Sequence, residues 1–240
     1  MANIWSLLQA RARTAGAAPL ITYIDSDSGE RTELSATSVA NAAAKIANAL
    51  RDEFELEAGA SVALGLPVHW QRSTWLAGVW TAGCRVLPGL QESDLLVTTP
   101  ALSAEATRVT SAPVVVVSMH PFGLPITEPM PDGVVDVTLA VRQQPDAFLY
   151  EPPDATLQAL ALEGAFVTQA EALDMATDLA AARGLARGGR LLVTDAAPST
   201  TSWLSALAVP LAMDASVVLM HGIGNSDAVA EQERITCRMN

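Results

Sequence analysis

The chain has 240 residues, half of them hydrophobic and 17% charged, a composition that excludes a disordered or fibrous protein. Its 14 basic and 26 acidic residues give a formal net charge of −12 at pH 7. This negative field disfavours nucleic acid and anionic membrane surfaces as partners.

Predicted strands and helices alternate in the first half of the chain. Apolar residues at helical spacing predict helices, and apolar or β-branched runs bounded by Gly, Pro or Asp predict strands. The expected elements are a helix over residues 4–14, a hairpin over 20–34 that turns at 25–30, a helix over 35–51 capped by Ser35, a strand over 60–66, a helix over 69–83, and strands over 84–87, 95–98 and 114–117 with a short helix over 102–107.

The second half of the chain begins with a proline-rich segment, residues 121–153, in which regular structure is often interrupted. Two short strands are still expected within it, over 134–141 and 147–150. The elements expected beyond it are a helix over 169–186, a strand over 190–194, a helix over 201–213 that Pro210 breaks late, and a strand over 216–220, whereas residues 231–238 fit neither pattern.

Strands that alternate with helices predict an α/β protein with a mostly parallel sheet flanked by helices. We expect a single domain over residues 1–240. The proline-rich segment is its expected internal boundary, with lobes at about 1–120 and 146–240.

The sequence also carries signals about location. Pro210 and Asp214 interrupt the longest apolar stretch, residues 203–220, so no membrane span is predicted. The first residues lack the basic region and apolar run of a signal peptide. The two cysteines, Cys84 and Cys237, are far apart and have no metal-ligand spacing. We therefore expect a reduced, cytoplasmic protein.

Two turns contain part of a ligand-binding pattern. Asp25-x-Asp27-x-Gly29-Glu30 has some of the spacing of a calcium loop but lacks the third oxygen ligand and the distal glutamate, so a solvated hairpin turn is favoured. His221-Gly-Ile-Gly224 follows a predicted strand, but a dinucleotide fingerprint needs a third glycine and a further βα unit. A tight strand exit is therefore favoured there.

The histidines give no metal site by their spacing. His69, His120 and His221 are too far apart in sequence, and no metal is predicted. His69 and His221 lie at predicted carboxyl ends of strands, where open α/β sheets form crevices, although capping or solvent exposure is the simpler interpretation. Ser226 is not the serine of a nucleophile elbow, because no histidine follows it.

The order of several short patterns resembles the N-terminal part of the AMP-forming adenylating enzymes, the acyl-CoA synthetase and luciferase superfamily. Residues 58–67 resemble that family's "G-D-x-V-A-x-x-x-P-N", residues 75–88 its "A-x-x-x-A-G-A-x-x-x-P-L", and residues 207–219 its "x-x-x-P-L-x-x-G-A-x-x-V-L". The hairpin over 21–35, the helix over 43–50 and the helix and strand over 180–194 complete the resemblance, which covers nearly the whole chain but about half of the family's large domain.

The residues that would hold ATP depart from the family. Its phosphate loop, "T-S-G-T-T-G-x-P-K-G", follows a strand that ends in tyrosine, and the corresponding strand here is expected to end at Tyr150. Glu151-Pro-Pro-Asp154 follows, so two acids replace phosphate donors and two prolines remove amides. The loop lysine falls near Ala159, and the family's later "T-H" is Thr168-Gln169.

Other nucleotide-binding parts are also expected to be absent. The resemblance implies that the adenine-contacting stretch, the magnesium-site glutamate, the ribose-binding aspartate and the mobile C-terminal domain would follow Asn240. The chain contains thirteen arginines and a single lysine, Lys45, in the first long helix, where it cannot replace either family lysine. This arginine bias is typical of a GC-rich bacterial genome.

These departures favour a catalytically degenerate, truncated adenylating-fold protein that acts as a binding or interaction module, with no cofactor and with a protein or a second copy as its partner. One alternative is an AMP-forming acyl-CoA or carboxylate ligase half that needs a partner chain. Another is a small-molecule binder at the crevice where the strands end, with Tyr150, Asp195, Trp203 and His221 as candidate lining residues.

Overall fold

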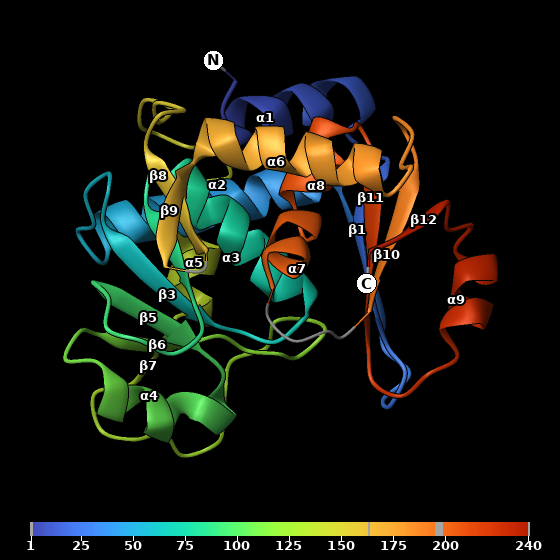
Figure 1. Ribbon diagram of the computed structural model, residues 1–240. Helices are drawn as coiled ribbons and strands as arrows, with labels where there is room; N and C mark the ends of the chain where they lie inside the picture. The colour runs from blue at the N-terminus through green and yellow to red at the C-terminus, as the bar shows by residue number, and fades with distance from the viewer. Residues whose placement is uncertain (1, 163, 195–198, 240) are drawn as a thin grey trace.

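The computed structural model describes residues 2–162, 164–194 and 199–239, and within them the strands form two sheets (Figure 1). Sheet A contains, in order across the sheet, β12 (Cys237–Arg238), β10 (Arg190–Thr194), β11 (Ser216–His221), β1 (Pro19–Asp25) and β2 (Arg31–Ser35). Sheet B contains, in order, β7 (Val135–Asp136), β6 (Val114–Val116), β5 (Leu95–Thr98), β3 (Ser61–Gly65), β4 (Arg85–Pro88), β8 (Gln158–Leu162) and β9 (Ala165–Thr168).

Both sheets are mostly parallel, as the sequence predicts. Of the paired strands in the described residues, only β1 with β2 and β8 with β9 run antiparallel. Sheet A joins the two ends of the chain, because β1 pairs in parallel with β11. The strands of sheet A therefore come from both sides of the proline-rich segment.

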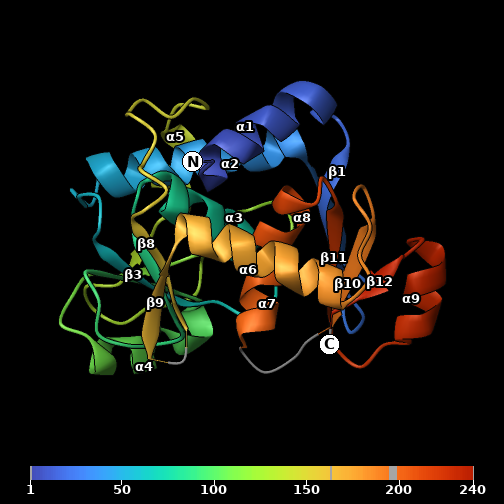
Figure 2. The same ribbon diagram turned by 45° about the horizontal axis from the view of Figure 1, so that its top comes forward.

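A layer of helices lies between the sheets (Figures 1 and 2). It consists of α1 (Ile4–Ala15), α2 (Ala36–Asp52), α3 (Trp70–Thr81), α6 (Gln169–Ala182), α7 (Thr200–Ser205) and α8 (Ala208–Ala212). The 3-10 turn η1 (Pro100–Leu102) leads into α4 (Ser103–Val109), which covers the far side of sheet B, while α9 (Ser226–Gln232) covers the far side of sheet A. None of the described helices is long and apolar enough to cross a membrane.

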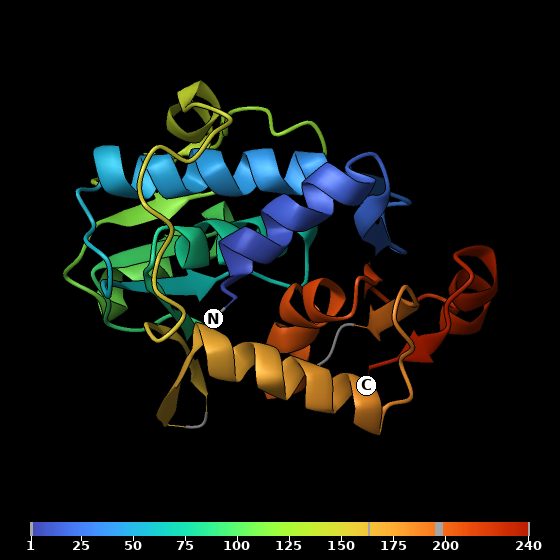
Figure 3. The same cartoon turned by 90° about the horizontal axis from the view of Figure 1, so that it is seen from above.

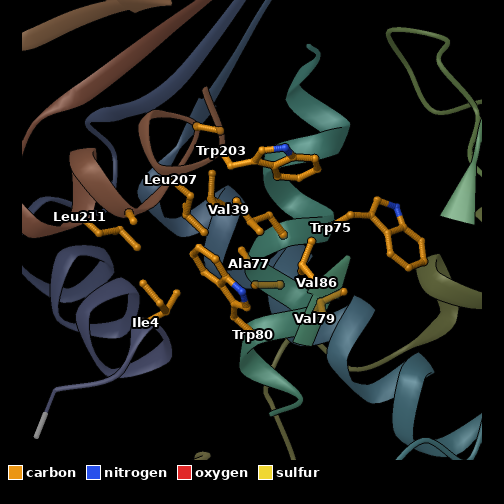
Figure 4. Packing of buried hydrophobic residues seen from close by; sticks show 14 of the residues in the cluster. Ile4, Val39, Trp75, Ala77, Val79, Trp80, Val86, Trp203, Leu207 and Leu211 are labelled. Atoms are coloured by element: carbon orange, nitrogen blue, oxygen red, sulfur yellow. The ribbon is translucent and has the colours of Figure 1, made fainter. Parts of the chain in front are cut away.

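Successive side chains along a strand point to opposite faces of the sheet, and apolar residues on both faces of each sheet are buried in hydrophobic clusters. In β10, Leu191 and Val193 join the central core between the sheets, whereas Leu192 packs on the outer side with residues of α9. In β5, Leu96 likewise points away from the central core, toward α4. Two buried tryptophans of α3 belong to the central core: Trp80 lies beside Ile4 and Leu207, and Trp75 lies on the other side of the helix (Figure 4).

The regular elements agree closely with the expectation, and the differences have physical causes. Ser35 does cap α2, because its hydroxyl accepts the Ser38 N–H at 3.1 Å. The helix expected over 201–213 is two helices, but the break lies at residues 206–207 rather than at Pro210. Pro210 fits into the first turn of α8, where a backbone N–H has no helical partner to lose.

The proline-rich segment differs most from the expectation. Residues 147–150 form no strand, and of 134–141 only β7 is extended, with α5 (Thr138–Gln143) following it. The β8–β9 hairpin was not expected, because alanine and leucine dominate residues 157–162 and favour helix over strand. The predictions of a strand over 147–150 and of a continuous strand over 134–141 are therefore wrong.

The proline-rich segment runs beside α2 (Figure 3). Two polar side chains of α2 hold it in place. The Lys45 ammonium donates to the carbonyl oxygens of Arg142, at 3.1 Å, and Gln144, at 2.6 Å, at the end of α5. It also pairs with the Asp146 carboxylate at 3.1 Å. Asn48, which is completely buried, bonds the backbone of the three alternate residues Pro145, Ala147 and Leu149.

We expect Asn48→Ala to lower the free energy of unfolding by about 2–3 kcal/mol, because it removes the three hydrogen bonds that a buried amide makes to the backbone of residues 145–149. Urea denaturation monitored by circular dichroism measures the change. Asn41→Ala is the matched control, since Asn41 lies on the same helix and forms no side-chain hydrogen bond within the described chain. Equal stability of Asn48→Ala and the wild type would contradict this role.

A candidate site at the carboxyl ends of the strands

A crevice opens where β1 and β11 of sheet A end opposite the loops that follow β3 and β6. Its volume is about 240 Å³. Parallel strands that end at one edge are the usual place for a ligand in open α/β sheets. The crevice is lined by Tyr23, Asp25, Glu30, Pro67, Val68, His69, Met119 and His221.

His69 forms the inner wall of this crevice and is only 3% exposed. It caps α3, since its Nδ1 accepts the Gln71 backbone N–H at 3.1 Å, and its ring lies 4.3 Å from that of Tyr23. Burial lowers the pKa of His69 to about 4. The ring is therefore neutral at pH 7, and because Nδ1 accepts a hydrogen bond, the proton lies on Nε2.

The outer wall is formed by two turns that meet at the edge of sheet A. Asp25 and His221 are paired residues at the ends of β1 and β11, and the Ser26 N–H donates to the His221 carbonyl at 3.0 Å. Glycines permit the contact: a Cβ at Gly222, whose φ is +82°, would lie 2.8 Å from the Asp27 carboxylate. The turn over residues 25–30 and the strand exit after His221 therefore have the structures that the sequence favours.

This meeting of turns brings together three groups that can bind a metal. Asp25, Asp27 and His221 each offer one ligand atom, and the three atoms lie within 4.8 Å of one another. The Asp25 carboxylate accepts from the Ser28 hydroxyl at 2.6 Å and the Asp27 N–H at 2.9 Å, and these bonds, the Ser28 hydroxyl first, lower its pKa. Asp25 is thus ionised at neutral pH.

Of the three expected lining residues that the structure describes, Tyr150, Trp203 and His221, only His221 lies at this crevice. Tyr150 lies on the surface of α2, where its hydroxyl donates to Asp52 and its ring stacks under Arg51. Trp203 is 2% exposed in α7, and the Arg72 guanidinium of α3 lies 4.8 Å from its ring centre (Figure 4). Asp195 lies outside the described residues.

A second cavity, of about 320 Å³, lies between α2, α3 and the proline-rich segment. It is mostly apolar, with Trp70, Trp75 and Phe122 in its lining, and Lys45 reaches it from α2. The Lys45 ammonium already contacts three oxygen acceptors, so the chain's single lysine stabilises the packing of the proline-rich segment on α2. The crevice at the strand ends, with its titratable groups, is the stronger candidate site.

Side chains and backbone groups in the region expected to match the phosphate loop form hydrogen bonds within the protein. The Asn3 amide donates to the carbonyl of buried Pro153 at 2.7 Å, and Asp154 caps its own turn by accepting the Thr156 N–H at 2.8 Å. Thr168 caps α6. Gln169 is 1% exposed and bridges two helices, accepting from Ile4 N–H at 3.0 Å and donating to the Trp80 carbonyl at 2.8 Å.

The strand that leads to Thr168-Gln169 is not the one that the sequence predicted. Residues 147–150 are irregular, and the strands before Thr168 are β8 and β9. These two strands pair antiparallel from Gln158 with Thr168 to Leu162 with Ala165. In the sequence only Glu163 and Gly164 separate them.

Comparison with known proteins gives the family. No model of a protein family matches the chain. It is 35% identical over 236 residues to a "TIGR03089 family protein" of Mycobacterium tuberculosis (strain ATCC 25618 / H37Rv), covering 96% of this chain and 93% of the relative. The chain belongs to the TIGR03089 family. The similarity extends over nearly the whole length of both sequences.

Solved structures show which fold this TIGR03089 protein has. An acyl-CoA synthetase of Brucella canis matches 99% of the chain with a TM-score of 0.79 and 21% identity, and an acetoacetyl-CoA synthetase of Streptomyces lividans matches 98% with a TM-score of 0.78 and 17% identity. The N-terminal domain of FACL13 from Mycobacterium tuberculosis matches 98%, with a TM-score of 0.73 and 15% identity. The chain spans 47%, 41% and 62% of these three structures, respectively. The predicted resemblance to the N-terminal part of the adenylating enzymes is confirmed at the level of the fold.

Proposed function

We propose that this TIGR03089 protein is a binding module built on the adenylating fold and that it does not form acyl-adenylates. The observation that supports this most directly is the short β8–β9 hairpin. Two residues join its strands, whereas the resemblance implies a ten-residue loop rich in Ser, Thr and Gly before Thr168-Gln169. Two residues cannot supply the backbone amides and hydroxyls that a triphosphate needs.

The charges near this hairpin support the same proposal. One of the two joining residues is an acid, Glu163, in a chain whose net charge is −12. A triphosphate requires concentrated positive charge, and phosphoryl chemistry depends mainly on that electrostatic stabilisation. Lys45 is held by the end of α5 and by Asp146, so it cannot serve a phosphate at β8 without releasing them.

We expect no change in melting temperature when ATP with Mg²⁺, or AMP, is added to the purified chain at millimolar concentration. A ligand present at 100 times its Kd stabilises a protein by about 2.7 kcal/mol. For a chain of this size that corresponds to roughly 5–10 °C, so real binding would be plain. The acyl-CoA synthetase of Brucella canis, measured alongside, is the positive control. Saturable binding of ATP by calorimetry would contradict the proposal.

The alternative of a ligase half predicts a different result. With a second chain that supplies the missing parts, pyrophosphate would be released from ATP in the presence of a carboxylic acid. We expect no release with the chain alone or with proteins that co-purify with it. Release that requires both chains would replace the binding-module proposal by the ligase alternative.

A further inference from the structure

We propose that Asp25, Asp27 and His221 form a binding site for a divalent transition-metal cation such as Zn²⁺, at the edge of sheet A where β1 and β11 end. The proposal is independent of the proposed function, because the site contains no part of the β8–β9 hairpin. It joins two turns whose sequences, taken separately, favour a solvated hairpin turn and a tight strand exit rather than a metal site.

The distances between the three side chains suit a small cation. Their ligand atoms lie within 4.8 Å of one another. In a tetrahedral site with ligands about 2.1 Å from the metal, ligand atoms are roughly 3.4 Å apart, so small side-chain rotations would complete the coordination. His221 and Asp25 are fixed by the β1–β11 pairing, and exposed Asp27 has the freedom to adjust.

The turns that carry these ligands are held together by the backbone. The Ser26 N–H donates to the His221 carbonyl at 3.0 Å. Cβ atoms at Gly222 and Gly224 would lie 2.8 Å from the Asp27 carboxylate and 2.1 Å from the Ser26 hydroxyl. A side chain at Gly222 would therefore displace the Asp27 carboxylate, and one at Gly224 would displace Ser26. The turns after β1 and β11 thus hold two carboxylates and an imidazole close together before any ligand binds, which lowers the entropic cost of binding.

Charge is the second argument for a cation. Asp25 and Asp27 lie side by side, and neither forms an ion pair with a lysine or arginine of the described chain, in contrast to Glu33, Asp214 and Glu233. The Asp25 carboxylate instead accepts hydrogen bonds from the Ser28 hydroxyl, at 2.6 Å, and the Asp27 N–H, at 2.9 Å. A cation bound between these two carboxylates would supply the positive charge that no lysine or arginine of the described chain provides there.

The ligand types select among cations. Calcium takes six to eight oxygen ligands and Mg²⁺ requires octahedral oxygen geometry, so three protein ligands including an imidazole suit neither well. Imidazole with carboxylates suits Zn²⁺ and its first-row neighbours. The adjoining crevice of about 240 Å³ has room for water or another small ligand to complete the coordination, with His69 in its wall.

The test is a calorimetric titration of the chelator-treated full chain with Zn²⁺, without nucleotide. We expect one saturable site. Asp27→Asn and His221→Gln should each weaken Zn²⁺ binding at least about tenfold. Asp154→Asn and His120→Gln are matched controls at an exposed turn aspartate and an exposed histidine, and both should bind as the wild type does.

A second readout separates loss of ligation from loss of fold. Co²⁺ bound by an imidazole and carboxylates gives visible absorption bands, which should appear with the wild type and disappear in Asp27→Asn while circular dichroism stays unchanged. Absence of a saturable site, equal weakening in the control variants, or tighter binding of Ca²⁺ than of Zn²⁺ would each overturn the proposal.

Discussion

Replacing Trp80 by alanine is expected to lower the free energy of unfolding by about 3–5 kcal/mol, the cost typical of removing a fully buried tryptophan. Trp80 is 0% exposed and lies in the central core near Ile4 and Leu207 (Figure 4). Its indole N–H also donates to the Ala159 carbonyl of β8 at 2.6 Å. Alanine would therefore leave a cavity between the sheets and an unpaired buried carbonyl.

Urea denaturation of three variants tests this expectation. Trp80→Phe keeps most of the buried volume and loses the hydrogen bond, so it should cost less than half as much as Trp80→Ala. Trp70→Ala is the matched control on the same helix, because Trp70 is partly exposed and its indole N–H has no hydrogen-bond partner in the described chain. A similar loss in the free energy of unfolding for Trp70→Ala and Trp80→Ala would contradict the larger contribution to stability expected of Trp80.

The sequence predicts local elements well where one physical signal dominates. Residues 95–98 and 190–194 are extended as expected, because apolar runs between turn signals leave little choice. The β8–β9 hairpin could not be predicted in this way. Its Ala and Leu residues prefer helix, and the strand forms because β4 pairs with it and the Trp80 indole N–H donates to the Ala159 carbonyl.

The composition of the candidate site is even harder to predict from local sequence patterns. Asp25 and His221 each stand out as polar residues at predicted strand ends, yet they are separated by most of the chain. Their proximity depends on the β1–β11 pairing, and strand order is set by non-local contacts that no local pattern reveals. For the same reason Tyr150 and Trp203, although suitable residue types, lie in other parts of the structure.

His69 predicts how stability depends on pH. Burial lowers its pKa from 6.5 to about 4 in the folded chain, with Asp25 opposing and His221 reinforcing the shift. The unfolded chain takes up a proton at this histidine as the pH falls below about 6.5, whereas the folded chain does not until about pH 4. The stability due to the neutral ring is therefore complete above pH 6.5 and is lost progressively down to pH 4. At 1.36 kcal/mol per pKa unit, the loss is about 3 kcal/mol.

We expect the free energy of unfolding of the wild type to fall by this amount more than that of His69→Asn over the same pH range. Asparagine keeps the cap of α3, since its side-chain oxygen can accept the Gln71 N–H in place of Nδ1, but it has no proton to gain. Carboxylates with lowered pKa values, such as Asp25 and Glu233, add a further loss at the acid end in both proteins, and the difference between the two curves removes it. Urea denaturation at steps from pH 7 to pH 4 measures both, with His120→Gln as the exposed-histidine control. Parallel curves for the wild type and His69→Asn would mean that His69 is protonated in the folded protein and that water reaches the inner wall of the crevice.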